Sequence, residues 1–158
     1  MLETVFRLSR MGLNIFPVAY GKKHDGLQWR QVTRSFTAWH EHPDDAEKYV
    51  FTGQFNIAVA CGQTSNHLIV IDFDDAEQAE RAYQYCLHNH PAVFAVNTRR
   101  GKHLYFFCTD GSIPKQKHPN IDIQSDGAYV VGAGSVYIDD TGQHHPYREH
   151  PNNTGIPT

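Results

Sequence analysis

Apolar residues recur at helical spacing in two stretches of the chain. In the first, residues 2–11, they form one stripe and Gly12 follows at the position where a helix would end. In the second, residues 75–90, the same period continues for four turns until Pro91. We therefore predict one short and one long amphipathic helix.

Elsewhere, short apolar runs are separated by turn residues, which is the pattern of β-strands. Strands are predicted over residues 14–20, 55–62, 67–74, 92–98, 102–108, 120–124, 128–133, 135–139 and 143–148. The second and third of these are expected to be neighbours across a Gly-Gln-Thr-Ser-Asn turn, and the fourth and fifth to form a hairpin. Residues 21–35 read as a basic loop, with one or two helical turns over 36–50. The fold class is α+β with mostly antiparallel strands.

Composition limits the domain organisation and the compartment. With 158 residues, of which 40% are hydrophobic, the chain suits one domain, expected over residues 1–150, with 151–158 as the start of a linker or tail. A net charge of -3 means that any nucleic-acid contact needs a local basic patch. The 3 cysteines form no C-x-x-C pair, and no membrane span or signal peptide is recognisable, so we expect a cytoplasmic protein.

The stretch LIVIDFDD, residues 68–75, runs from a buried strand directly into carboxylates. Asp72 and Asp74 share one face of this strand because side chains alternate. Asp74 or Asp75 can cap the following helix, with Glu77 or Gln78 completing a capping box, but that leaves Asp72 unexplained. Two carboxylates about 4 Å apart repel by about 4 kcal/mol at an effective dielectric of 20, so a cation between them is favoured. Mg²⁺ or Mn²⁺ is the natural candidate.

Two further features would complete such a site. Asp122 lies inside the strand of residues 120–124, where the plain alternative is a half-exposed strand acid. Between the acids, the turn of residues 98–103 places Arg99, Arg100 and Lys102 around His103. A glycine turn with cations and an imidazole is suited to a triphosphate, although basic turns are often merely solvated.

These motifs and their order resemble the archaeo-eukaryotic primase superfamily, and within it the N-terminal domain of bifunctional DNA primase-polymerases. The resemblance covers nearly the whole chain, through GLNIFPVAYGKK, NIAVACG, LIVIDFD, NTRRGKHLYF and IDIQSDGAYVVGAGS. It implies an RRM-like catalytic sheet packed by helices, plus a smaller N-terminal α/β part. The chain departs from relatives at Gln124, where many carry arginine, and at Ala133 and Gly134, where they carry prolines.

Site residues follow from the resemblance by position. It implies that Asp72, Asp74 and Asp122 are the catalytic, metal-binding acids, and that nucleotide is bound by His103, Thr98, Arg99, Gly101, Lys102 and Ser135. The proline that usually follows the early lysine is missing, which leaves Lys22 and Lys23 unassigned.

The implied activity is template-directed DNA synthesis in replication, in which two Mg²⁺ or Mn²⁺ ions assist phosphoryl transfer from nucleoside triphosphates. The implied partners are single-stranded DNA template and primer, and a helicase domain or subunit in the full-length protein. Candidates for template contact are Arg30, Arg34, Trp29, Lys115, Lys117 and Tyr129. Two other classes remain open: a different D-x-D metal enzyme, such as a nuclease or nucleotide-sugar transferase, and a non-catalytic nucleic-acid or nucleotide binding module.

Overall fold

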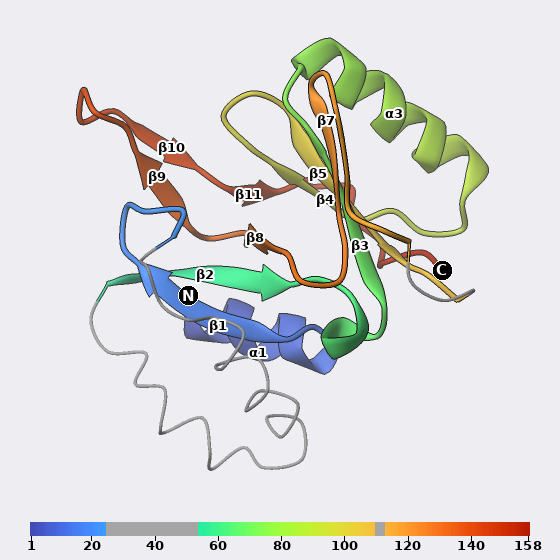
Figure 1. Cartoon of the computed structure of the whole chain (residues 1–158), viewed down its shortest axis with the longest axis horizontal. Coiled ribbons are helices and arrows are strands. Elements are labelled where there is room, and N and C mark those ends of the chain that lie inside the picture. The colour runs from blue at the N-terminus through green and yellow to red at the C-terminus, as the bar shows by residue number, and fades with distance from the viewer. Residues whose placement is uncertain (25–53, 110–112) are drawn as a thin grey trace.

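The computed structural model describes residues 1–24, 54–109 and 113–158, and all structural statements below concern these ranges (Figure 1). The helical turns predicted over 36–50 and the template candidates Trp29, Arg30 and Arg34 lie outside them. Within these ranges the protein is α+β with antiparallel pairing between its strands, as predicted. No helix in the described ranges is long and apolar enough to cross a membrane.

A six-stranded antiparallel sheet forms the larger half of the molecule, with strand order β11-β4-β5-β3-β7-β6. Its strands are β3 (Leu68–Phe73), β4 (Ala95–Asn97), β5 (Lys102–Phe107), β6 (Gln116–His118), β7 (Ile121–Gln124) and β11 (Arg148–Glu149). The predicted hairpin of β4 and β5 is present. The edge strands β6 and β11 were not predicted, because they are short and have no apolar alternation.

A second, three-stranded sheet has the order β1-β2-β8 and is built from β1 (Ile15–Ala19), β2 (Phe55–Ala60) and β8 (Tyr129–Val131). Helix α1 (Leu2–Arg10), predicted from its stripe, packs on this sheet through Val5 and Leu8, which are fully buried. Figure 1 shows α1 beneath this sheet and α3 (Ala76–Asn89) on the outer side of the larger one.

The two faces of β3 and β5 are buried against different neighbours. Leu68 and Val70 belong to the large core shared with the three-stranded sheet. Phe73 and Leu104 face the other way and pack with Ala79, Tyr83 and Cys86 of α3. Burial of apolar area on both faces is what stabilises this central strand pair. Asp72 therefore continues the face that meets the second sheet, at the strand end where the apolar packing stops.

Helix α3 begins at the acid that follows the D-x-D pair. Asp75 is the N-cap and its Oδ1 accepts the backbone N–H of Gln78 at 2.8 Å, so the capping prediction is confirmed for Asp75. The reciprocal half of a capping box is not made, because Gln78 Oε1 is buried without a partner in the described structure. Asp74, one residue earlier, is thus not used by the cap.

The prediction that strands 55–62 and 67–74 are neighbours was wrong. β2 pairs with β1 and β8, and β3 pairs with β5 and β7. Backbone pairing between the two segments is limited to a bridge between Gly62 and Leu68. The connection contains the 3₁₀ turn η2 (Gln63–Ser65), and Asn66 and His67 adopt left-handed φ values of 54° and 59°. This turn redirects the chain into the other sheet rather than closing a hairpin.

The C-terminal part crosses between the sheets. After β8, the strands predicted over 135–139 and 143–148 are present as β9 (Val136–Ile138) and β10 (His144–Pro146), which pair as a separate two-stranded arm that leads into β11 (Figure 1). Residues 151–158, expected as the start of a linker, lie along the larger sheet. Pro157 O accepts the N–H of Phe107 at 2.8 Å, and Thr154 Oγ1 accepts that of Val93 at 3.1 Å.

Candidate functional site

Strand register brings the sequence-predicted acids and histidine into one row. Asp72 is the Cα partner of His103 on β5 and of Asp122 on β7. Directly paired residues project from the same face of a sheet, so these three side chains point to the same side. Lys117 of β6 is the next partner in the row, and its Nζ lies 3.9 Å from Asp122 Oδ2.

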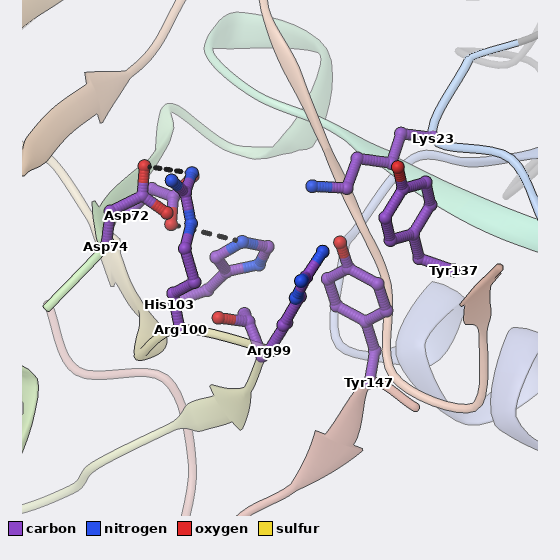
Figure 2. A pocket seen from close by; sticks show the side chains of 9 residues that line it. Lys23, Asp72, Asp74, Arg99, Arg100, His103, Tyr137 and Tyr147 are labelled. Carbon is purple, nitrogen blue, oxygen red and sulfur yellow. Dashed lines mark hydrogen bonds and ion pairs between the residues drawn. The ribbon is translucent and has the colours of Figure 1, made fainter. Parts of the chain in front are cut away.

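A cavity of about 390 Å³ opens at one end of this row. Figure 2 shows its lining side chains: Lys23, Asp72, Asp74, Thr98, Arg99, Arg100, His103, Tyr137 and Tyr147. Acids lie at one end, whereas Lys23, Arg99 and two tyrosines lie at the other. Asp122 is adjacent to Asp72 in the sheet but is not among the lining residues.

The charge around Asp72 is only partly compensated. Burial, followed by the negative charges of Asp74 and Asp122, raises the pKa of Asp72 to about 6 against the opposing effects of Lys23 and Arg100. Arg100 donates to Asp74 Oδ2 at 2.7 Å, in an exposed ion pair. The site therefore holds a negative potential centred on a carboxylate whose side chain is only 25% exposed.

His103 is a neutral imidazole at physiological pH. Its burial, followed by the positive charge of Lys23, lowers its pKa to about 3. His103 Nε2 lies 3.4 Å from Asp72 Oδ1, and Nδ1 has no hydrogen-bond partner in the described structure. A buried imidazole nitrogen without a partner is costly, so it points to a group that binds there.

Thr98 and Gly101 close the β4–β5 turn that carries the arginines. Thr98 N donates to Gly101 O at 3.0 Å, and Gly101 N donates to Thr98 Oγ1 at 3.1 Å. A Cβ at position 101 would lie far inside van der Waals contact with the carbonyl oxygen of Phe73, so only glycine fits. The turn thereby sets Arg99 and Arg100 at the cavity.

Lys102 and Ser135 are not brought to the cavity. Lys102 precedes His103 on β5 and therefore faces α3, where its Nζ contacts Asn97 Oδ1 at 3.0 Å and Glu80 Oε2 at 3.2 Å. The buried Ser135 hydroxyl accepts the N–H of Ile57 at 2.9 Å and donates to its carbonyl at 3.3 Å. Both residues have structural partners that explain them.

Four lining residues were missing from the residues implied by the sequence: Lys23, Arg100, Tyr137 and Tyr147. Arg100 had been noted as part of the basic turn, and Lys23 follows the early motif, so a signal existed for both. The sequence around the two tyrosines contains no such signal, since their position depends on how the β9–β10 arm packs against the β4–β5 turn. A second cavity of about 240 Å³ shares Lys23, Asp72, His103 and Tyr147 and extends to Gln124 and the β8 residues Tyr129, Val130 and Val131.

Carboxylates, cations and a neutral imidazole around one cavity are the groups expected where phosphates and a hard metal ion are handled. Comparison with known families agrees: the family model Prim-Pol, bifunctional DNA primase/polymerase, N-terminal, matches residues 6–157. The chain therefore belongs to the Prim-Pol family of primase/polymerase domains. No curated protein matches it.

The acids are near one another but are not arranged as a ready metal site. Within residues 1–24, 54–109 and 113–158, no three side chains of His, Cys, Asp or Glu are placed to hold a metal ion together. Arg100 and Lys117 lie at two of the carboxylates instead. The donor set, oxygen only and with unbalanced charge at Asp72, nevertheless suits Mg²⁺ or Mn²⁺.

Proposed function

We propose that this chain is a template-directed DNA primase/polymerase domain, a nucleotidyltransferase that uses nucleoside triphosphates with Mg²⁺ or Mn²⁺. The observation that carries the proposal is the cross-strand row of His103, Asp72 and Asp122 beside a cavity rimmed by Lys23 and Arg99. Family membership sets the class of activity, and this row supplies acids for metal and bases for phosphate.

Asp72, Asp74 and Asp122 would hold the metal ions. Bound divalent ions would activate a primer 3′-hydroxyl and stabilise the leaving pyrophosphate. For this, Asp74 must release Arg100, and Asp122 must release Lys117. The cation of each pair is exposed, and the Lys117 contact is long, at 3.9 Å. Surface ion pairs contribute only about 0–1 kcal/mol, so a divalent cation would displace both cations readily.

The opposite wall would hold the triphosphate. Lys23 and Arg99 carry fixed positive charge into the cavity, and Arg100, once free of Asp74, would add a third cation. His103 is neutral, so it would donate a hydrogen bond to a phosphate oxygen rather than supply charge. Its single N–H is on Nε2 while that nitrogen faces Asp72 Oδ1, so this Nε2–H would make the contact once a metal ion occupies Asp72.

Nucleic acid would lie beyond the acids. Lys115 and Lys117 are exposed at and beside the edge strand β6, next to Asp122, and would contact the phosphates of primer or template. Tyr129 borders the second cavity, where a base or sugar would fit. A helicase domain or subunit in the full-length protein remains part of this proposal.

Primer extension on a defined template tests the proposal. The wild-type chain should incorporate labelled nucleotide only when template and Mn²⁺ or Mg²⁺ are present, and Asp72→Asn should abolish incorporation. Asp140→Asn, which removes an exposed acid of the same size, is the matched control and should leave the rate unchanged. Template-independent transfer from a nucleotide sugar, or degradation of the DNA, would instead favour another D-x-D enzyme. Nucleotide binding that neither needs metal nor changes in Asp72→Ala would favour a non-catalytic module.

A further inference from the structure

The β9–β10 arm presents one face to the cavity, and that face contacts two of its cations. Tyr137 and His145 are Cα partners across the arm, and their rings stack with centroids 6.0 Å apart and an interplanar angle of 26°. Lys23 Nζ lies over the Tyr137 ring, 4.7 Å from its centroid. Figure 2 shows Tyr137 beside Lys23 at the far side of the cavity from the acids.

The second cation is held by an acid on the same face. Asp139, two residues after Tyr137, lies with its Oδ2 2.7 Å from His145 Nε2 and 3.8 Å from Arg99 NH1. A bond from His145 and a contact from Arg99 thus meet at one carboxylate oxygen. Lys23 follows β1 and Arg99 lies in the β4–β5 turn, so one arm joins side chains from both larger sheets.

The Asp139 carboxylate is itself fixed by the turn of the arm. Its Oδ1 accepts the N–H of Thr141 at 3.0 Å, the hydroxyl of Thr141 at 2.6 Å and the N–H of Gln143 at 3.0 Å. The hydrogen bonds from His145 and Thr141 are the main reason that its pKa lies well below its ordinary value. Asp139 is therefore a permanent, immobile negative charge facing Arg99.

The base of the arm is anchored where Lys23 leaves the three-stranded sheet. Ile138 N donates to Gly21 O at 2.9 Å, and Gly21 forms a bridge with Tyr137. Asn56 Nδ2 donates to the carbonyls of Lys22 and Val136 at 2.8 and 2.6 Å. These bonds fix the loop before Lys23 to the arm, so the Lys23 ammonium and the Tyr137 ring keep their relative positions.

We propose that the β9–β10 arm is a positioning device for the anion-binding wall of the cavity, with Asp139 holding Arg99 and Tyr137 holding Lys23. This inference rests on the proposed function and adds to it two positioning residues that touch no reacting atom. Preorganised cations bind a polyanion more tightly than free ones because less side-chain entropy is lost on binding. The arm thereby sets the affinity for the triphosphate and not the chemistry at the acids.

The test uses inorganic tripolyphosphate as the probe, measured by calorimetry with the wild-type chain, so that anion binding is separated from templated synthesis. Asp139→Asn keeps the turn acceptor but loses the charge. We expect it to weaken tripolyphosphate binding about two- to fivefold, the range of an exposed ion pair. Asp140→Asn, an exposed acid beside it, should have no effect. Tyr137→Leu should weaken binding by a similar factor through loss of the cation–π contact.

Two further variants distinguish positioning from a merely structural role. Asp139→Glu restores the charge but disturbs the turn bonds, so it should recover tripolyphosphate affinity while lowering the melting temperature. Adding Asp139→Asn to Arg99→Gln should cause no further loss of affinity, because the acid acts through the arginine. In primer extension, KM for nucleotide should rise in Asp139→Asn with kcat nearly unchanged.

The outcomes separate the inference from the proposed function. Any of three results would overturn the inference. Asp139→Asn could bind tripolyphosphate as tightly as the wild type, the losses of affinity in the double variant could be additive, or the wild-type chain could bind no tripolyphosphate. The wild-type chain could bind tripolyphosphate, and Asp139→Asn could bind it more weakly, while neither incorporates nucleotide on a template. That result would overturn the proposed function and leave the arm's role in place.

Discussion

Replacing Asp72 by asparagine should stabilise the metal-free protein while removing its activity. The ordinary pKa of this carboxyl is 3.8 and the folded protein raises it to about 6, chiefly by burial and then by Asp74 and Asp122. That difference corresponds to about 3 kcal/mol of unfavourable charge once Asp72 is ionised. Asparagine has nearly the same volume and removes the charge, so the free energy of unfolding should rise by up to about this amount.

The pH dependence has a definite sign. Between pH 3.8 and about 6 the folded state holds a proton on Asp72 that the unfolded chain has lost, so wild-type stability falls as pH rises through this window. Above about pH 6 the ionised carboxyl destabilises the folded state by the full amount, and below pH 3.8 this destabilisation vanishes. The stability difference between Asp72→Asn and wild type should therefore be large at neutral pH and close to zero at low pH.

Urea unfolding in EDTA at about pH 7.5 measures the difference. With an m-value of about 2 kcal/mol/M, the midpoint of Asp72→Asn should lie up to about 1.5 M above that of wild type. Mn²⁺ at about 1,000 times its dissociation constant should reverse the order, since binding then stabilises the wild type by about 4.1 kcal/mol and finds no complete site in the variant. A variant less stable than wild type in EDTA, or a gap that persists at low pH, would refute the reasoning.

Three other substitutions test local structure. Gly101→Ala should destabilise the protein by about 1–3 kcal/mol in urea unfolding, because the new Cβ meets the Phe73 carbonyl; unchanged stability would mean that the turn can relax. Ser135→Ala should cost about 1–2 kcal/mol through the lost bonds to Ile57 but leave KM for nucleotide unchanged, and a raised KM would instead support the contact implied by the sequence. Asp75→Ala should cost about 1 kcal/mol of thermal stability as an N-cap loss, without affecting metal-dependent stabilisation.

Strand alternation was enough to predict much of the site. The period of two placed Asp72 and Asp74 on one face, and the pairing of β3 with β7 confirms that Asp122 is next to Asp72. The same alternation implies that Lys102 faces away from His103. Lys102 was nevertheless assigned to the nucleotide because it lies in the basic motif. Local sequence rules work here because strand register converts them directly into positions in space.

Sequence reasoning failed where position depends on contacts between sheets. After β2 the chain leaves the three-stranded sheet and enters the six-stranded one. This change depends on the left-handed backbone of Asn66 and His67, which has no reliable signature in a single sequence. Tyr137 and Tyr147 reach the cavity only because the arm folds back from β8 to β11. Likewise, the resemblance implied a nucleotide contact for Ser135, yet the packing of β2 directs its hydroxyl to the backbone of Ile57.

The register of β3, β5, β6 and β7 sets both the row of Lys117, Asp122, Asp72 and His103 and the packing of the core. If β3 slipped by one residue against its neighbours, Asp72 would turn into the apolar layer beneath α3 and Ile71 or Phe73 would take its place beside the histidine. Such a chain would lose its core and its acids together, so misregistered copies would be eliminated as unstable proteins and not persist as inactive ones. The hydrogen-bond ladder that gives the protein its stability is thus the same one that assembles the candidate site.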